Sequence, residues 1–374
     1  MKSLTYISAA LTALINTAAA VTGAAEGFAK GVTGGGSATP VYPSTTAELV
    51  SYLQDSQPRV IMLNKEFNFI GTAGRTTATG CAPWGTGSAC QLAINANNWC
   101  NGQGGSVSVN YDNAAISAIT LGSNKSLIGV GNKGVIRGKG LRMVSGAKNI
   151  IIQNIHITEL NPQYVWGGDA ITFNGCDLVW IDHVTTSLIG RQHYVAGYES
   201  SGRITISNSK IDGTTSWSAS CDGHHYWTAL FIGSGDLITF KNNYIYRTSG
   251  RAPKLGGNTL FHAVNNYWYD NTGHAFDIDS GGMVMAEGNV FQNVKASVNS
   301  GRAGQLFGSP DSSTNTKCAS YLGHNCQVNA YGSSPALGGT DTNFFTNFQG
   351  KNIASASTAE SAKNVANTAG FGKI

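Results

Sequence analysis

The stretch from Asn149 to Val294 repeats a short run of alternating apolar residues that ends at a polar position. Each run is too short for a helix and lacks a 3.6-residue period, so it predicts a β-strand. β-Branched residues dominate these runs, as strands favour. The runs begin at Ile150, Leu178, Arg203, Leu237, Leu260 and Met283. The polar positions are Asn154, His183, Asn208, Asn243, Asn266 and Asn289.

These polar positions recur every 23 to 35 residues, a spacing typical of a solenoid with one repeat per coil. A single coil cannot bury its apolar face alone, so neighbouring coils must stack. We therefore expect an all-β fold, a right-handed single-stranded parallel β-helix with short capping helices and long surface loops. The asparagines are expected to form an internal ladder in which each amide bonds to the next coil.

The segments around the repeat predict its coverings. Residues 21–43 are rich in Gly and Thr and are expected to form an extended arm that packs on the cap. A helix with a threonine N-cap is expected over residues 45–53, at the open end of the solenoid. Residues 59–69 alternate enough to be the first strand, and residues 71–112 predict a long loop pinned by disulfides. Residues 298–374 are expected to wrap back over the solenoid and to include a helix near the C-terminus.

The composition supports a turn-rich β protein. Glycine accounts for 48 of 374 residues and charged residues for 12 % of the chain, about twice and half of ordinary usage. The net charge of +4 includes no run of lysine or arginine, which argues against a nucleic-acid partner. A mildly basic groove would still favour a polyanion.

The N-terminus has the pattern of a secretory signal. Lys2 gives a positive start, residues 4–15 form an apolar run, and three alanines at 18–20 suit cleavage. We therefore expect residues 1–20 to be removed and residues 21–374 to form one secreted, extracellular domain without a membrane anchor.

Seven cysteines fit an oxidising destination and leave one thiol over. Cys176 lies in the repeat beside an apolar strand and is the candidate for the free, buried cysteine. Cys318 and Cys326 are close enough to clip a short loop. The spacings match no zinc pattern, and the sequon at Asn124 is a candidate glycosylation site.

Offsets from the polar positions identify residues on one face, because stacked coils lie about 4.8 Å apart. Arg191, Arg251 and His274 each lie eight residues after such a position, and each follows a glycine. Lys254 comes three residues after Arg251, and Asp169 sits in a turn one coil before Arg191. These residues either share a groove of cations around a carboxylate or form a solvated row of charges at loop tips.

Tryptophans near this face favour a groove. Trp166 and Trp227 lie in connecting turns, and Trp84 and Trp99 lie in the cysteine-rich loop. Exposed aromatic rings beside a cationic groove suit an extended, partly apolar ligand such as a sugar chain. Three further tryptophans are expected to pack inside the protein: Trp180, Trp217 and Trp268.

With these residues in place, the chain resembles the pectate/pectin lyase superfamily, and specifically the fungal pectin lyases. The resemblance runs from about residue 25 to residue 307. It rests on the motifs AEGFAKGVTGGG at Ala25, GGDAI at Gly167, VWIDH at Val179, GRQHY at Gly190 and SGRAPK at Ser249. It implies the parallel β-helix fold and an enzyme that cleaves galacturonan by β-elimination, without consuming water.

The resemblance also implies roles for single residues. Arg251, in an Arg-x-Pro motif, matches the family's catalytic arginine, and Asp169 matches its invariant aspartate. Gly167 stands where calcium-dependent relatives carry a further carboxylate, and the next coil offers Arg191 instead. A methyl ester is already neutral, so the resemblance implies a pectin lyase that needs no metal cofactor. Arg251 would be the base, while Arg191 and Lys254 would stabilise the enolate and Asp169 would orient a cation.

The implied partner is pectin, a methyl-esterified polygalacturonan, acted on by a monomer. Arginine is normally always protonated, so a basic Arg251 depends on neighbouring cations and desolvation, which lower a cation's pKa. Other functions remain open: a calcium-dependent pectate lyase, a glycoside hydrolase with paired carboxylates, or a non-catalytic carbohydrate-binding module that would not require Arg251. The implied disulfides are Cys81–Cys100, Cys90–Cys221 and Cys318–Cys326.

Overall fold

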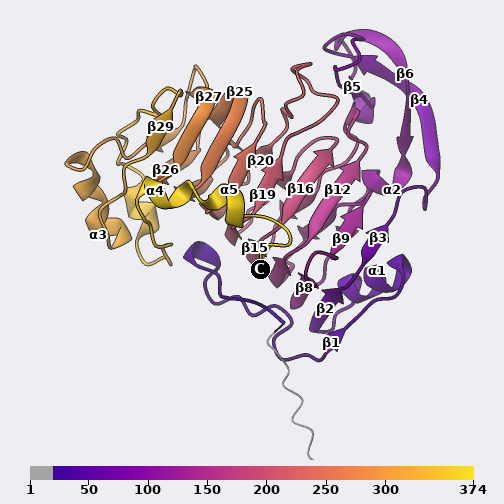
Figure 1. Cartoon of the computed structure of the whole chain (residues 1–374), viewed down its shortest axis with the longest axis horizontal. Coiled ribbons are helices and arrows are strands. Elements are labelled where there is room, and N and C mark those ends of the chain that lie inside the picture. The colour runs from indigo at the N-terminus through magenta and orange to yellow at the C-terminus, as the bar shows by residue number, and fades with distance from the viewer. Residues whose placement is uncertain (1–19) are drawn as a thin grey trace, which may run out of the picture.

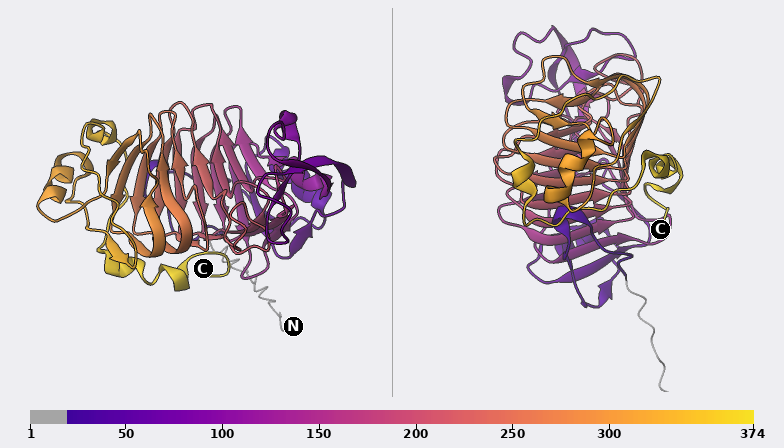
Figure 2. Two further views of the ribbon diagram at one scale, coloured as in Figure 1. Left: turned by 90° about the horizontal axis from the view of Figure 1, so that it is seen from above. Right: turned by 90° about the vertical axis from the view of Figure 1, so that its left-hand side faces the viewer.

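The computed structural model describes residues 20–374 and confirms the right-handed parallel β-helix. Strands of successive coils lie side by side along one axis, with loops projecting at one end (Figures 1 and 2). The predicted secretory signal, residues 1–20, falls outside the described residues except for its last position. Within the described part, no helix is long and apolar enough to cross a membrane.

Ten parallel strands form the first face of the solenoid. Their order along the axis is β1 (Pro40–Val41), β2 (Arg59–Leu63), β8 (Lys125–Gly129), β11 (Lys148–Gln153), β15 (Asp177–Asp182), β18 (Arg203–Ser207), β21 (Leu237–Lys241), β24 (Leu260–Val264), β26 (Met283–Glu287) and β28 (Gln305–Phe307).

A fifteen-stranded sheet makes the other two faces, because the long strand β25 pairs with both. One face comprises β3 (Glu66–Asn68), β9 (Val135–Arg137), β12 (His156–Leu160), β16 (Thr185–Ile189), β19 (Lys210–Asp212), β22 (Tyr244–Tyr246), β25 (Tyr267–Ile278), β27 (Val290–Val298) and β29 (Ala330–Gly332). The remaining face comprises β23 (Lys254–Leu255), β20 (Ala229–Phe231), β17 (Tyr194–Ala196), β14 (Ile171–Asn174), β10 (Leu141–Val144) and β7 (Ile119–Thr120).

Residues of the same kind stack from coil to coil inside the solenoid. On the fifteen-stranded sheet, the Trp268 and Phe291 rings lie 4.7 Å apart and nearly parallel, and Tyr331 continues the stack. Each fully buried side chain of this size contributes about 1.5–3 kcal/mol relative to exposure. On the ten-stranded sheet, one column of apolar side chains is fully buried and in register: Ile150, Val179, Ile204, Ile238, Phe261, Val284 and Leu306.

The asparagine ladder exists, but only over the later coils. The backbone N–H of Asn243 donates to Asn266 Oδ1 at 2.9 Å. In the same way, the backbone N–H of Asn266 donates to Asn289 Oδ1 at 2.8 Å, and that of Asn289 donates to Asn329 Oδ1 at 2.8 Å. Ser209 begins the ladder by donating its own N–H to Asn243 Oδ1.

The prediction that three earlier residues belong to this ladder is wrong by one position. Asn154, His183 and Asn208 are in register with Asn242 and Asn265, and all five adopt positive φ between 47° and 56°. They form the left-handed turn residue just before the ladder position. Asparagine tolerates that backbone conformation better than most residues, so one residue type marks two adjacent positions.

The N-terminal coverings differ in part from the prediction. The helix α1 (Thr46–Gln54) has Thr45 as its N-cap and buries two leucines in the core at the end of the solenoid, as expected. Most of the arm before it does not pack on this cap, since the short 3₁₀ helix η1 (Gly27–Ala29) lies across β15, β18 and β21. Its last residues do lie at the cap, where β1 pairs with β2. The expected first strand is two strands, β2 and β3, and β1 precedes them.

The C-terminal segment wraps back over the solenoid, as expected. Its helical part is two short helices, α4 (Ala359–Ala362) and α5 (Val365–Thr368), visible in yellow in Figure 1. The final residues tie down the turns, because the Gly372 N–H donates to Asn154 Oδ1 at 2.7 Å. The other short helices are η2 (Ala96–Asn98), α2 (Asn113–Ile116), η3 (Thr314–Cys318), α3 (Ala319–Leu322) and η4 (Phe345–Phe348).

A buried carboxylate fastens the C-terminal loop that Cys318 and Cys326 close. Glu287 accepts hydrogen bonds from His262 at 2.8 Å and from His324 at 3.0 Å. These partners lower the pKa of Glu287 to about 2 in spite of its burial, and Glu287 raises the pKa of His324.

We expect the Glu287–His324 ion pair to contribute most to folding stability at mildly acidic pH. The lowered pKa of Glu287 gives stability above its unfolded value of about 4.3 that is lost as pH falls towards 2. The raised pKa of His324 gives stability below about pH 6.5 that is lost as pH rises through the folded value. His324→Gln keeps a donor that does not titrate. The wild-type advantage in Tm over this variant should shrink between pH 6 and 8, and a pH-independent difference would contradict the assignment.

Candidate active site

A disulfide-braced sheet forms one wall of the candidate site. The predicted loop over residues 71–112 contains regular structure, since β4 (Arg75–Ala82) and β6 (Gly105–Asp112) form an antiparallel hairpin. With β5 (Leu92–Ala93) and β13 (Tyr164–Val165) they make a four-stranded sheet that projects from the solenoid (Figure 1). Residues 71–112 show no clear alternation of apolar and polar positions, so the sequence pattern did not predict this hairpin.

The three implied disulfides are present, and two of them position this wall. Cys81–Cys100 closes the loop between β4 and β6, and Cys90–Cys221 ties that loop to the turn before β20. Cys318–Cys326 closes the C-terminal loop. Cys176 is free and buried, as expected.

Between this wall and the turns of three coils lies a cleft of about 540 Å³. Trp84 and Trp99 line it from the wall, and Trp227, Arg251 and His274 line it from the solenoid. The remaining lining residues were not singled out from the sequence, and most are small or polar: Gln103, Ala219, Ser220, Tyr226, Ser249, Thr272 and Gly273.

The predicted common register holds for two of the three basic residues. The pairing of Lys254 with Asp277 places Arg251 level with His274, one coil apart. The pairings of Tyr194 with Ala229 and of Leu230 with Lys254 place Gln192 level with Arg251. Arg191 therefore lies one residue before that register, because its offset was counted from His183, a turn residue.

Arg251 lies with its guanidinium group over aromatic rings. Its Cζ is 4.8 Å from the centre of the Trp227 ring and 5.8 Å from that of Tyr226. Within residues 20–374, no carboxylate pairs with Arg251, and its buried Nε has no hydrogen-bond partner. Its φ of 45° is unusual for a residue with a side chain, and such strain is concentrated at functional sites.

Arg191 and Asp169 form an ion pair beside Arg251. Arg191 Nη1 lies 3.8 Å from Asp169 Oδ2, and the Arg191 guanidinium stacks 3.9 Å above Trp166. Burial lowers the pKa of Arg191 and nearby Arg251 lowers it further, against the opposing effect of Asp169. The Asp169 side chain keeps 26 % of its surface exposed but lies deep in the fold. Desolvation therefore raises the pKa of Asp169, although Arg191 and the hydrogen bond from the Gln192 N–H act to lower it.

Lys254 is held by two carboxylates that were not predicted. Its Nζ lies 3.2 Å from Asp277 Oδ2 and 2.8 Å from Asp279 Oδ2. These partners raise the pKa of Lys254 although burial opposes them. A signal existed, because Asp277 follows Lys254 by the same 23 residues that separate Asn243 from Asn266 and Asn266 from Asn289.

The four tryptophans predicted to bind the substrate cluster as one aromatic group. Trp84 contacts Trp99 and Trp227 with ring centres 6.4 and 6.0 Å apart, and Trp99 contacts Trp166 at 6.4 Å. Trp166 lies behind Trp99 and beneath Arg191 rather than on the cleft surface described above.

The other predictions for single residues have mixed outcomes. Trp180 and Trp268 are buried, as expected, whereas Trp217 is half-buried and outside the hydrophobic clusters, so its core prediction is wrong. Asn124 Oδ1 accepts a hydrogen bond from Asn149 Nδ2 at 2.8 Å, in a partly buried position. Glycosylation there stays a prediction.

The residues around Asp169 do not fit a calcium ion. Calcium takes six to eight oxygen ligands, and Asp169 faces an arginine instead. A side chain at Gly167 would place its Cβ 2.6 Å from the Tyr164 carbonyl oxygen, so this position has no room for a further carboxylate. Across residues 20–374, no group of three or more His, Cys, Asp or Glu side chains is placed to hold a metal.

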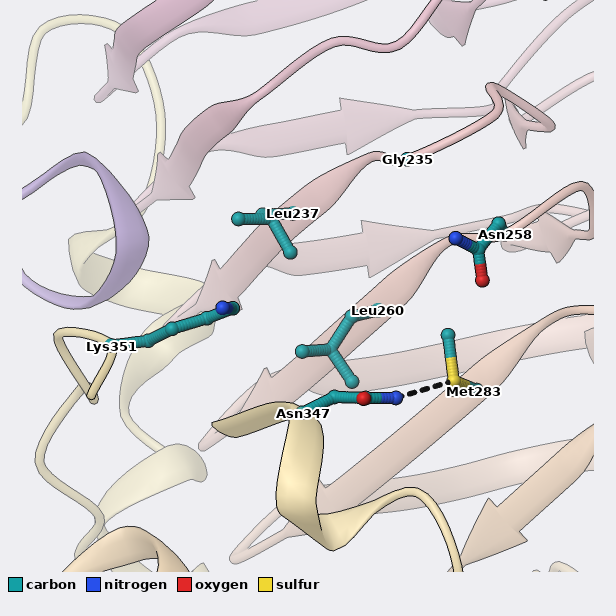
Figure 3. Close-up of a pocket in the computed structure, with 7 residues that line it drawn as sticks. All are labelled: Gly235, Leu237, Asn258, Leu260, Met283, Asn347 and Lys351. Atoms are coloured by element: carbon teal, nitrogen blue, oxygen red, sulfur yellow. Dashed lines mark hydrogen bonds between the residues drawn. The ribbon is translucent and has the colours of Figure 1, made fainter. Parts of the chain in front are cut away.

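A second pocket, of about 210 Å³, lies on the ten-stranded sheet (Figure 3). Leu237, Leu260 and Met283 form its apolar floor, and Lys351 and Asn347 of the C-terminal segment reach over it. Its lining contains no carboxylate, imidazole or guanidinium group. Arg251 and His274, by contrast, line the larger cleft.

Comparison with known proteins identifies the family of this chain. A family model described as "Pectate lyase" matches residues 1–374. The chain is 66 % identical to pectin lyase B of Emericella nidulans and 66 % identical to a probable pectin lyase A of Aspergillus fumigatus. Each match covers 96 % of this chain, and 95 % and 96 % of the relatives respectively.

Solved structures share the fold. A Bacillus pectate lyase in complex with trigalacturonate superposes with a TM-score of 0.62 at 23 % identity, covering 94 % of this chain and 99 % of that one. Pectate lyase II of Xanthomonas campestris superposes with a TM-score of 0.60 at 20 % identity, covering 93 % and 98 %. The chain therefore belongs to the pectate lyase family of polysaccharide lyases, alongside the fungal pectin lyases.

Proposed function

We propose that this protein is a secreted, monomeric pectin lyase that cleaves methyl-esterified α-1,4-galacturonan by β-elimination without calcium, with Arg251 as the base. The relatives named above are pectin lyases, and one solved relative binds trigalacturonate. Three disulfides support secretion, since such bonds persist in oxidising compartments.

One observation carries the assignment of the base. Of the three cations near the cleft, Arg191 faces Asp169 and Lys254 faces two aspartates, whereas Arg251 has no carboxylate partner within residues 20–374. A carboxylate would hold a guanidinium in its protonated form. Arg251 is thus the one of these three cations whose charge no carboxylate holds, and we assign it as the base on that ground.

The reaction moves one proton and breaks one C–O bond. Neutral Arg251 takes the proton from C5, the electron pair forms the C4–C5 double bond, and O4 leaves with its share of the chain. O4 takes up a proton, and Arg251 releases the one it gained. Charge develops on the C6 carbonyl oxygen during this step, and each cationic donor aimed at it contributes about 2.7–4 kcal/mol. We assign that role to Arg191 and Lys254.

Asp169 and the tryptophans complete the site. Asp169 fixes Arg191 through the 3.8 Å ion pair and offsets the repulsion between neighbouring cations. Trp84, Trp99 and Trp227 present ring surfaces along the cleft, which suits the flat faces of consecutive sugar units. Trp166 supports the Arg191 guanidinium from below.

A methylation series tests this function. We expect kcat/KM on highly methylated pectin to exceed that on polygalacturonate by at least about 10²-fold, equivalent to about 2.7 kcal/mol. The reason is that an ester makes C5–H more acidic, while the cleft has no calcium site to neutralise a free carboxylate. Ultraviolet absorbance of the unsaturated product measures the rate. Preference for polygalacturonate, or new reducing ends without unsaturation, would contradict the proposal.

A further inference from the structure

The backbone N–H and the backbone carbonyl of Arg251 are both held by hydrogen bonds. Its N–H donates to Nε2 of His274 at 3.2 Å, and its carbonyl oxygen accepts from the Ala229 N–H at 2.7 Å. His274 belongs to the next coil and lies in the same register. Arg251 has a φ of 45°, and an L-residue keeps such a conformation only where its surroundings fix it.

The hydrogen bond requires a neutral imidazole. Nε2 accepts a hydrogen bond here, so the ring proton must sit on Nδ1, and a doubly protonated ring would present a donor to the Arg251 N–H. Burial lowers the pKa of His274, and the charges of Arg251 and Lys254 lower it further. Asp277 Oδ2, 3.9 Å from Nε2, opposes them, and the Tyr226 ring packs edge-on at 5.9 Å.

We propose that His274 is a positioning residue for the proposed base: its neutral Nε2 fixes the backbone of Arg251 in the conformation that aims the guanidinium over Trp227, and protonation of the ring releases that backbone. The inference deepens the proposed function and rests on it. The activity would then depend on the protonation state of His274, although the proton on this ring is not transferred in the reaction.

A second histidine makes a contrasting bond in the same site. His225 Nε2 lies 2.7 Å from the carbonyl oxygen of Arg191, so here the ring nitrogen donates. Burial lowers the pKa of His225 to about 4. Protonation of His225 leaves its Nε2–H in place, so that bond survives in acid. Only the His274 bond is lost on protonation of its ring.

Two variants of His274 distinguish a role in hydrogen bonding to the Arg251 backbone from a role in packing alone. His274→Gln supplies an amide oxygen that accepts the Arg251 N–H and does not titrate in this range. His274→Leu keeps a side chain of similar bulk without an acceptor. The substrate is a fully methyl-esterified galacturonan oligosaccharide, which carries no free carboxyl along the chain, and kcat and KM are measured from about pH 3 to 8 with far-ultraviolet circular dichroism as the folding check.

For the wild type, we expect kcat to fall on the acid side of an apparent pKa below 6.5, the ordinary histidine value. His274→Gln should keep much of the optimal kcat and lose this acid limb. His274→Leu should have a kcat about 10²-fold below the wild-type optimum, without this acid limb and with KM within about twofold, because a displaced catalytic group costs rate on that scale. The difference from the wild type should therefore shrink as the pH falls.

An acid limb unchanged in His274→Gln would assign it to another group, such as Asp169, and would overturn the inference. Wild-type kcat in a folded His274→Leu would do the same. If His274→Leu does not fold, the pH profile of His274→Gln decides alone. A wild type that makes no unsaturated product from this substrate overturns the proposed function and the inference together, whereas an active wild type with unaltered variants overturns only the inference.

Discussion

Replacing Arg251 with lysine is expected to lower kcat on highly methylated pectin by about 10³-fold, the usual scale for loss of a positioned base. Lysine keeps the positive charge but loses the planar guanidinium that lies 4.8 Å over Trp227. Its shorter, flexible ammonium would not occupy the same place beside C5. KM should change by less than about fivefold, because the tryptophan surfaces that hold the sugar chain stay in place. Initial rates of unsaturated-product formation measure the effect.

Arg247→Lys is the matched control. Arg247 lies four residues earlier, also has a positive φ of 53°, and pairs with Asp270 at 3.5 Å outside the cleft lining. The same chemical change there should leave kcat within about twofold of the wild type. Near-wild-type turnover in Arg251→Lys, or equal losses in both variants, would show that Arg251 is not the base.

Replacing Asn266 with alanine is expected to destabilise the protein by about 3 kcal/mol. Asn266 sits in the middle of the ladder, where its Oδ1 accepts the Asn243 N–H and its Nδ2 donates to the Phe240 carbonyl at 2.7 Å and to Asn289 Oδ1 at 3.0 Å. Alanine leaves the buried Asn243 N–H without a partner, at about 1–3 kcal/mol, and it also removes the side-chain bonds to the Phe240 carbonyl and to Asn289. Denaturant unfolding followed by circular dichroism measures the shift in midpoint.

Asn132→Ala provides the comparison, since Asn132 lies exposed in a turn and should shift stability by less than about 0.5 kcal/mol. A loss in Asn266→Ala no greater than that in Asn132→Ala would mean that the ladder is not what holds these coils together.

The fold was predictable from the sequence because each coil repeats its own apolar period. The exact register was not, because asparagine serves both the left-handed turn and the internal ladder. Asn208 and Asn243 look alike in sequence, yet Asn208 occupies the turn position and Asn243 the ladder position that follows it. Strand pairing, rather than residue type, decides between them. This one-residue ambiguity displaced Arg191 from its predicted register and left the later coils correct.

The sequence predicted those site residues that are related by the repeat of the coils. It did not predict those that the loops bring together. Arg251 and His274 share a register as expected, and the same 23-residue spacing would have found Asp277 beside Lys254. Tyr226 and Ser220 enter the cleft from a turn that Cys90–Cys221 folds against the hairpin. No local pattern encodes that contact between segments 131 residues apart. The prediction that Trp217 packs in the core was wrong for a related reason, since this residue lies in the same irregular turn.

The most direct test of the account is turnover of highly methylated pectin by the wild-type protein, with excess EDTA and then with added calcium. The account predicts the same initial rate of unsaturated-product formation in both conditions. The reason is that Asp169 faces Arg191 where calcium would need further carboxylates, and Gly167 leaves no room for one. Loss of activity in EDTA that calcium restores would contradict it.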